Sequence, residues 1–584
     1  MLATTNPPTL ELTLPAALAR AVERRLARWA EERFAERLWA KDPTLWAPDP
    51  GECGPPFPPE LEDRLGWLDL PRTDPGELAA FAEEVRRDGL RHAVLLGMGG
   101  SSLAPEVLHG VLGARPGYPE LTVLDSTHPE AVRAVRQDLE ATGGPARTLF
   151  LVASKSGTTV ETLALFRYFW EEVAAATPEP GARFCAVTDP GTPLADLAGE
   201  RRFRRVFLAP PDVGGRYSAL SVFGLAPAAV GGLDLGRLLA RIDPNAGSTA
   251  GGGLRHRLRA PAPENPGLRL AAALAEAALT AGRDKLTFLA APALAQLPAW
   301  IEQLVAESLG KEGRGIVPVA DEPVLAAAGY GPDRLFVSLE VGESGEDGGD
   351  GALTESLDAL AAAGHPVVRI ALPDRHDLGG VMLLWEVATA AAGAALGVHP
   401  FDQPDVELAK RRAKEAMAGE GGVAGVEEVP VHDEERLRRA VAEWLGEAGA
   451  GSGGDEDGRP YVALQAFLPP TPEIDHDLRE LRLLVADRRR LATTAGYGPR
   501  FLHSTGQLHK GGPAAGLFLQ LVDEPAAELP VPGTGHGFGE LIRAQAVGDY
   551  RALVEAGRRV LRVQLGRDRA AGLARLQDAF EDAL

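Results

Sequence analysis

Residues 150–162, FLVASKSGTTVET, contain an apolar run, a hydroxyl-rich turn and the start of a helical pattern. The run 150–152 is typical of a buried strand, and apolar residues at helical spacing begin at Val160. Between them lie four hydroxyl side chains and one lysine: Ser154, Lys155, Ser156, Thr158 and Thr159. A helix N-terminus presents free backbone N–H groups and a positive dipole end, so this turn is suited to an anion. The spacing is neither that of a Walker loop nor that of a dinucleotide-binding loop. We therefore expect it to bind a small phosphate monoester.

Short apolar segments alternate with helical patterns on both sides of this turn. The expected strands lie at 92–98, 121–126, 148–154, 184–189, 205–209, 285–291, 316–319, 334–341, 366–372, 461–468 and 516–522. Such alternation predicts an α/β fold in which parallel, doubly wound sheets are covered by helices on both faces. Ligands of such sheets bind at the carboxyl ends of the strands. The segments GMGGSS (97–102) and SKSGTT (154–159) both follow expected strands, so we place a site there.

The pattern divides the chain of 584 residues into four regions. We expect a helical extension over 1–80, because an amphipathic pattern runs from 10 to 45. Two α/β domains should follow over 81–255 and 256–425, and a further C-terminal α/β region over 426–584. Gly-rich, acidic segments at 342–351 and 446–459 are typical of solvated loops or linkers.

Composition limits the possible partners and the compartment. The formal net charge of −22 argues against nucleic acid or an anionic membrane as the main partner. We find neither a signal-peptide pattern nor an apolar run of membrane-spanning length. Cys53 and Cys185 are too few for a disulfide framework or a metal cluster. These features predict a cytoplasmic protein that binds no membrane and no nucleic acid.

Six segments together resemble the glucose-6-phosphate isomerase family, which is built from two sugar-isomerase domains. They are GMGGSSLAPEVL (97–108), VASKSGTTVET (152–162), GGRYSALSVFGL (214–225), PAWIEQLVAESLGKEGRG (298–315), GVHPFDQPDVELAK (397–410) and HSTGQ (503–507). The N-terminal helix and the C-terminal region are most similar to the isomerase part of bifunctional transaldolase/glucose-6-phosphate isomerase proteins. No transaldolase barrel fits within this chain, so we expect that second activity to be absent.

The resemblance implies reversible isomerisation of glucose 6-phosphate and fructose 6-phosphate through an enediol. Such a reaction needs a carboxylate base, a cation or donor near the developing oxyanion, an acid for ring opening and a phosphate anchor. By resemblance the base is Glu307, and Gln303, four residues earlier on the same helix face, binds substrate hydroxyls. Arg216 in GGRYS would stabilise the enediolate oxygen, and Lys410 would assist ring opening.

His503 is the candidate acid for ring opening, since the unperturbed pKa of an imidazole lies near neutrality. Its place in the chain departs from the family pattern, in which the matching histidine lies between the ESxGK helix and the FDQ segment. Here it follows both. Either the histidine returns to the site in space from the C-terminal region, or another group fills the role. His509 and Lys510 are weaker candidates.

The remaining expectations concern the anchor, the partners and the alternatives. The phosphate should meet Ser154, Lys155, Ser156, Thr158 and Thr159, with Gly100 and Ser101 forming the other wall. The family implies no cofactor, no metal and a homodimer. One alternative is another sugar-phosphate isomerase, including one that also accepts mannose 6-phosphate. A non-catalytic sugar-phosphate sensor is disfavoured, because such a protein would not need Glu307, Arg216 and Lys410 together.

Overall fold

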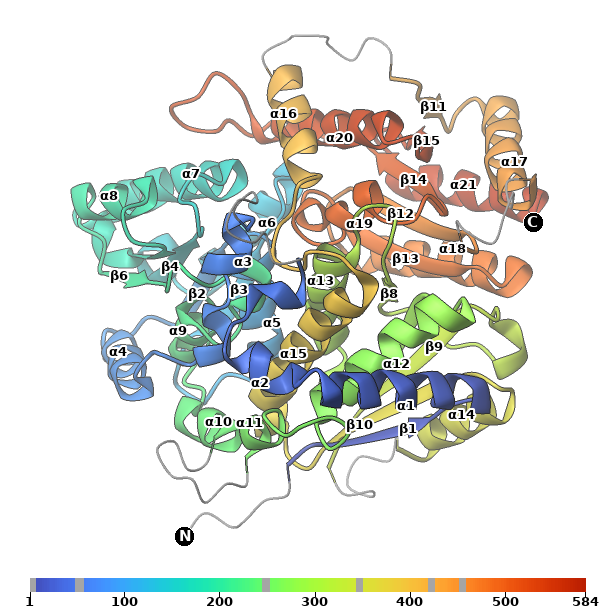
Figure 1. The fold of residues 1–584 in the computed structure, drawn as a ribbon. Helices are drawn as coiled ribbons and strands as arrows, with labels where there is room; N and C mark the ends of the chain where they lie inside the picture. The colour runs from blue at the N-terminus through green and yellow to red at the C-terminus, as the bar shows by residue number, and fades with distance from the viewer. Residues whose placement is uncertain (1–6, 48–56, 244–252, 343–349, 418–425, 451–457) are drawn as a thin grey trace.

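The computed structural model describes residues 7–47, 57–243, 253–342, 350–417, 426–450 and 458–584. The described residues form three five-stranded sheets with helices on their faces (Figure 1). The first sheet holds β2 (His92–Leu96), β3 (Glu120–Leu124), β4 (Thr148–Ala153), β5 (Phe184–Thr188) and β6 (Arg205–Leu208). The second holds β1 (Thr9–Thr13), β7 (Lys285–Ala290), β8 (Val317–Val319), β9 (Arg334–Val341) and β10 (Val367–Leu372). The third holds β11 (Val429–Pro430), β12 (Tyr461–Phe467), β13 (Ala492–Tyr497), β14 (Gly516–Val522) and β15 (Arg559–Gln564).

All three sheets share one strand order. Counted from one edge, four strands of each sheet run β3-β2-β4-β5, β8-β7-β9-β10 and β13-β12-β14-β15, and within each set every pairing is parallel. In each set the strand that comes first in the sequence (β2, β7 or β12) lies second in the order. The chain passes from it to the edge strand and then crosses back to pair on its other side, which creates a switch point. The expected doubly wound fold is confirmed, and the C-terminal region repeats the strand order of the two domains before it.

Helices cover these sheets and join them. They are α1 (Ala16–Glu31), α2 (Phe34–Trp39), α3 (Pro59–Asp63), α4 (Pro75–Arg87), α5 (Leu103–Leu112), α6 (Pro129–Ala141), α7 (Val160–Ala176), α8 (Pro193–Glu200), α9 (Val222–Val230), α10 (Leu235–Ile242), α11 (Leu254–Arg257), α12 (Pro266–Ala281), α13 (Leu297–Leu309), α14 (Asp350–Ala362), α15 (Leu378–Leu396), α16 (Val406–Met417), α17 (Glu434–Ala450), α18 (Pro472–Arg489), α19 (Gly506–Gly511), α20 (Phe538–Glu555) and α21 (Arg569–Ala583).

Helix α15 lies in the core that the first two sheets share, and it packs against α12 and α13 (Figure 1). By length and composition the segment Arg375–Leu396 could span a membrane, so our statement that the chain holds no such run is wrong. Most of the segment is buried inside the protein. A core helix of a large protein is apolar on all sides for the same reason as a membrane span, because no face of it meets water.

The sequence pattern predicts a helical N-terminal region, but the structure shows that this region is not wholly helical. Residues Thr9–Thr13 form strand β1, which pairs antiparallel with β10 at the edge of the second sheet. Helix α1 begins only at Ala16 and packs against α12, with Arg25 Nε 2.7 Å from Glu276 Oε1. The alternation TLELT is typical of an edge strand. The amphipathic pattern counted from residue 10 starts inside this strand, so the prediction merges the strand with the start of the helix. The boundaries of the four regions stay a prediction.

The third sheet is joined to the second through buried charges. Arg334 on β9 and Glu322 form an ion pair at 2.8 Å, and each side chain is about 1% exposed. Glu322 also accepts a hydrogen bond from the backbone N–H of Thr493 on β13. From α18, Arg482 donates to the backbone oxygens of Ala320 and Asp321. Buried charges need such partners, so this contact fixes how the third sheet sits on the second.

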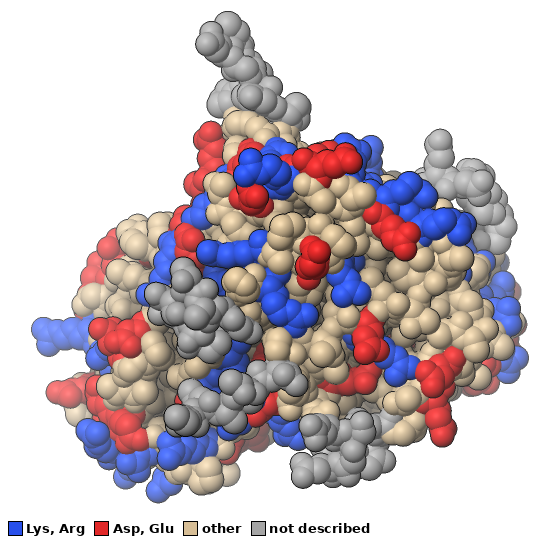
Figure 2. All heavy atoms as spheres, turned by 60° about the horizontal axis from the view of Figure 1, so that its bottom comes forward, with Lys and Arg blue, Asp and Glu red and all other residues tan. Residues whose placement is uncertain are grey.

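The surface shown in Figure 2 carries acidic and basic side chains interspersed with uncharged ones. On this face the net charge of −22 does not gather into one acidic field.

Candidate functional site

The hydroxyl-rich turn joins the buried strand β4 to the N-terminus of α7. Ser154 Oγ and Thr159 Oγ1 are hydrogen-bonded at 2.8 Å, and Ser156 Oγ and Thr158 Oγ1 at 2.9 Å. Ser156 and Thr158 are exposed. Thr159, at the N-cap position, makes no side-chain hydrogen bond to the first turn of α7. The turn therefore offers hydroxyls and a helix N-terminus that its own cap does not satisfy, as an anion site requires.

Gly157 gives this turn its shape. Its φ is +70°, and a Cβ atom there would lie 2.8 Å from Cβ of Thr192. The Lys155 ammonium forms an ion pair with Asp189. The charge of Lys155 is thus already paired, and its predicted part in binding a phosphate stays a prediction.

The glycines of GMGGSS bring three parts of the chain together. Gly99 has φ +53°, and a Cβ there would lie 2.4 Å from the backbone oxygen of His503 and 2.9 Å from Nε2 of Gln303. A Cβ on Gly100 would lie 2.3 Å from the backbone oxygen of Gly215. Gly100 thus allows close packing next to Arg216; its role, and that of the buried Ser101, as a phosphate wall stays a prediction.

Glu307, Gln303 and Arg216 meet in a buried cluster. Arg216 Nη1 lies 3.1 Å from Glu307 Oε1, and Gln303 Nε2 donates to Glu307 Oε2 at 3.1 Å. The exposed fractions of the Arg216 and Glu307 side chains are 4% and 8%. Gln303 Oε1 is buried and has no hydrogen-bond partner among the residues that the structure describes. An unpartnered buried acceptor is costly, so this oxygen is suited to a substrate hydroxyl.

Four acceptors hold the Arg216 guanidinium in place. Besides Glu307, it donates to Ser308 Oγ at 2.7 Å and to the backbone oxygens of Pro400 and Asp402 at 2.5 and 2.9 Å. The last two belong to the segment that precedes α16. Sequence reasoning missed Ser308, although it lies inside the quoted ES motif. The planar fork of the arginine presents several N–H groups in fixed directions, so it can donate to all four acceptors at once.

Lys311 also binds the segment that precedes α16. Its Nζ donates to Asp402 Oδ1 at 2.6 Å and to the backbone oxygens of Asp402 and His399. Lys311 and Arg216 therefore share the Asp402 carbonyl. Burial and then the neighbouring Arg216 charge lower the pKa of Lys311 to about 7.

This shift predicts a pH dependence of stability. An unfolded lysine has a pKa near 10.4, so between about pH 7 and 10.4 the unfolded chain binds a proton that the folded chain does not. The contribution of Lys311 therefore makes the fold more stable as pH rises through this window and is constant below it. In Lys311→Met the free energy of unfolding, measured in urea, should rise less steeply with pH, by up to about 1.4 kcal/mol per pH unit. Parallel curves for variant and wild type would contradict the assignment.

His503 from the C-terminal region contacts Gln303, and its role as the acid stays a prediction. It ends a 3₁₀ turn (Arg500–His503), and its backbone oxygen accepts a hydrogen bond from Gln303 Nε2 at 2.8 Å. Its ring Nε2 lies 3.0 Å from Oε1 of Glu161, in the first turn of α7. The third sheet thus supplies a histidine to the first two domains within one chain. Sequence reasoning missed Glu161, although it stands in the motif TTVET.

The two weaker candidates from HSTGQLHK serve the interior of the third sheet. His509 is buried, lies 3.2 Å from Gln465, and has a pKa well below the usual value because of burial. Lys510 forms a buried ion pair with Asp549 at 2.6 Å. Gln507 instead reaches back to the second domain, donating to the Gly310 carbonyl and accepting from the Asp405 N–H. That amide holds the histidine turn against α13.

Lys410 lies in helix α16, which begins at Val406. Its side chain lies outside the described residues, so its role stays a prediction.

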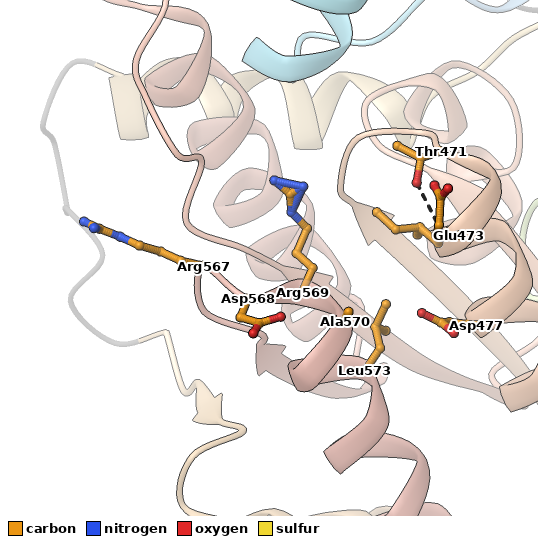
Figure 3. Close-up of a pocket in the computed structure, with 9 residues that line it drawn as sticks. Thr471, Glu473, Asp477, Arg567, Asp568, Arg569, Ala570 and Leu573 are labelled. Carbon is orange, nitrogen blue, oxygen red and sulfur yellow. Dashed lines mark hydrogen bonds between the residues drawn. The ribbon is translucent and has the colours of Figure 1, made fainter.

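A cavity of about 560 Å³ opens at the carboxyl edge of the third sheet (Figure 3). Its lining comes from the N-termini of α18 and α21, and consists of Thr471, Glu473, Ile474, Asp477, Arg567, Asp568, Arg569, Ala570 and Leu573. None of the site residues named above lines it. Within the described parts of the chain, no three His, Cys, Asp or Glu side chains gather so that they could hold a metal ion.

Comparison with known proteins finds the same relationship that the motifs indicated. A family model described as phosphoglucose isomerase matches residues 82–316. Glucose-6-phosphate isomerase of Rubrobacter xylanophilus is 34% identical over 398 residues, which cover 60% of this chain and 88% of that protein. The crystal structure of a hypothetical protein from Thermus thermophilus has a TM-score of 0.55 and 28% identity, over 70% of this chain and 100% of that one. A glucose-6-phosphate isomerase from Chlamydia trachomatis has a TM-score of 0.53 at 19% identity, over 69% of this chain and 85% of that one, and shows likeness of fold alone.

Proposed function

Because the chain belongs to the phosphoglucose isomerase family, we propose that it interconverts glucose 6-phosphate and fructose 6-phosphate. The observation that carries the proposal is the buried contact of Glu307 with Arg216 and Gln303, which His503 connects to the first turn of α7. It supplies a carboxylate for proton transfer and a cation for a developing oxyanion in one place.

Glu307 is the group that moves the proton between C1 and C2. Arg216 lies 3.1 Å from it, so a sugar bound against Glu307 has the guanidinium close to the oxygens of C1 and C2. When the carboxylate removes the C2 proton of the open-chain aldose, the enediolate oxygen gains negative charge that Arg216 stabilises. Returning that proton to C1, while the hydroxyl proton on O2 passes to O1, yields the ketose, and no atom is gained or lost overall.

The turn at 154–159 and His503 supply the other two groups that the isomerisation needs. The hydroxyls and the helix N-terminus at 154–159 hold the phosphate away from the reacting carbons. His503, next to Gln303, is the acid that gives a proton to the ring oxygen as the ring opens. Its neutral form can take the proton back when the ring closes.

The direct test mixes purified protein with fructose 6-phosphate and couples glucose 6-phosphate formation to a dehydrogenase. We expect turnover without added metal or cofactor. Tight binding of fructose 6-phosphate without turnover would overturn the proposal in favour of a sensor. The same assay with mannose 6-phosphate, coupled through fructose 6-phosphate, tests the broader specificity.

The phosphate turn can be tested separately through substrate affinity. Thr158→Val removes an exposed hydroxyl and keeps the side-chain shape, so KM for fructose 6-phosphate should rise about tenfold, as expected for one hydrogen bond to a charged group. The kcat value should stay within about twofold, because the phosphate is bound equally in substrate and transition state.

Thr471→Val is the matched control for this change. Thr471 caps α18 at the cavity in the third sheet, where its hydroxyl accepts from the Ile474 N–H. The control should lower stability by about 1 kcal/mol through the lost cap and leave KM unchanged. A KM that rises in Thr471→Val but not in Thr158→Val would move the phosphate to the third sheet.

A further inference from the structure

A chain of buried hydrogen bonds links His503 to a glutamine far along the sequence. Gln545 lies on α20, and its Nε2 donates to Glu161 Oε1 at 2.7 Å. The same Glu161 oxygen lies 3.0 Å from His503 Nε2. At the other end of the amide, Thr127 Oγ1 donates to Gln545 Oε1 at 2.8 Å. Thr127, Glu161 and Gln545 are 0%, 7% and 5% exposed.

We propose that Gln545 is a positioning residue for His503: held by Thr127, it directs an amide N–H at Glu161 and so selects the ring nitrogen of His503 that carries the proton. The inference rests on the proposed isomerase function for its kinetic consequences. Its structural consequence can be observed without turnover.

The direction of the amide follows from what each neighbour can donate. An ionised carboxylate only accepts hydrogen bonds, whereas the threonine hydroxyl can donate. With Gln545 Oε1 satisfied by Thr127, its NH₂ group must face Glu161. A hydrogen bond to a carboxylate favours the ionised form. The threonine thus keeps the amide from turning its oxygen toward Glu161.

The state of Glu161 in turn sets the tautomer of His503. Facing an ionised oxygen at 3.0 Å, Nε2 must carry a proton, since a lone pair there would repel the carboxylate. Nδ1 then remains as the nitrogen that exchanges a proton with the sugar. If the amide were lost, Glu161 would lose one of its donors and could rotate away or take up a proton. Neutral His503 would then populate both tautomers.

The arrangement joins separate parts of the fold. Thr127 lies between β3 and α6 and Glu161 on α7, both around the first sheet, whereas His503 and Gln545 belong to the third. The third sheet therefore supplies both the histidine and the group that orients its partner.

The test compares Gln545→Leu, Thr127→Val and Thr127→Ser with wild type. Gln545→Leu should lower kcat for glucose 6-phosphate about tenfold or more, since a buried hydrogen bond to a charged group is lost. KM should change by less than about twofold, because the phosphate turn is untouched. Thr127→Val should also lower kcat, whereas Thr127→Ser, which keeps the hydroxyl, should have the wild-type kcat.

Asp523→Asn is the matched control. It weakens another buried contact between the same two sheets, His128 Nε2 to Asp523 Oδ2 at 3.2 Å, and does not touch Glu161. It should leave kcat within about twofold. An equal loss of kcat in Asp523→Asn and Gln545→Leu, or in Thr127→Ser and Thr127→Val, would make the contact merely structural and overturn the proposal.

The tautomer itself is read from ¹⁵N NMR of histidine-labelled protein at a pH where the ring is neutral. The His503 signal is assigned by its loss in His503→Gln. We expect the proton on Nε2 in wild type and a mixture in Gln545→Leu; an unchanged pattern in Gln545→Leu would overturn the proposal. If wild type shows no isomerase turnover, the proposed function fails, and this measurement still decides the role of Gln545.

Discussion

Glu307→Gln is expected to abolish proton exchange between C1 and C2 while leaving fructose 6-phosphate bound. The amide keeps the shape of the side chain, and its one oxygen can still accept from Arg216, but it cannot take up a proton from carbon. We expect kcat to fall roughly 10²- to 10⁴-fold, the range for loss of a general base. Loss of label from substrate deuterated at C2 measures the exchange directly, and calorimetry measures binding.

Glu302→Gln on the same helix is the control. Glu302 precedes Gln303 and is partly buried, and burial raises its pKa to about 8. The carboxyl is therefore mainly protonated at pH 7, and an amide should replace it with little effect on kcat. Should Glu302→Gln stop the exchange and Glu307→Gln retain it, the base would be Glu302.

Arg216→Gln is expected to damage both activity and stability. Loss of the cation beside the reacting oxygens should lower kcat by about 10²- to 10³-fold, as for other preorganised donors to an oxyanion. It also leaves the Glu307 carboxylate buried without its charge partner, which typically costs about 3–5 kcal/mol of folding free energy. Both effects follow from one buried contact at 3.1 Å.

The double variant Arg216→Gln/Glu307→Gln separates the two effects. It has no buried charge left unpaired at this position, so its urea midpoint should lie above that of Arg216→Gln alone, while activity stays absent. Additive losses of stability in the double variant would show that the two side chains do not depend on one another.

Much of the fold was predictable because its signals are local. The strands at 148–153, 285–290 and 461–467 are short, apolar and bounded by turns, and their alternation with helices indicated the parallel sheets before any contact was known. Strand β15, RVLRVQ, was missed because two of its six residues are arginines. One of them, Arg562, is buried and paired with Glu428, a partner 134 residues away that no sequence window contains.

In the candidate site, too, the features with local signals could be predicted and those that depend on distant partners could not. Glu307 and Gln303 share a helix face because they are four residues apart, and the turn at 154–159 lies between a strand and a helix, so both could be placed from sequence. The ion pair of Lys155 could not be predicted, since its partner Asp189 follows the next strand of the sheet.

The stretch 150–162 by itself determined a strand, a hydroxyl-rich turn and a helix N-terminus, because hydrogen bonds and backbone conformation within a few residues are enough to form them. Only the tertiary structure decided that Glu161 in that stretch meets His503, 342 residues further along. That contact depends on the third sheet docking on the first two, and docking is governed by packing and buried charge pairs among distant segments. The pattern of residues within a short stretch of sequence does not indicate which distant segments pack or pair with it.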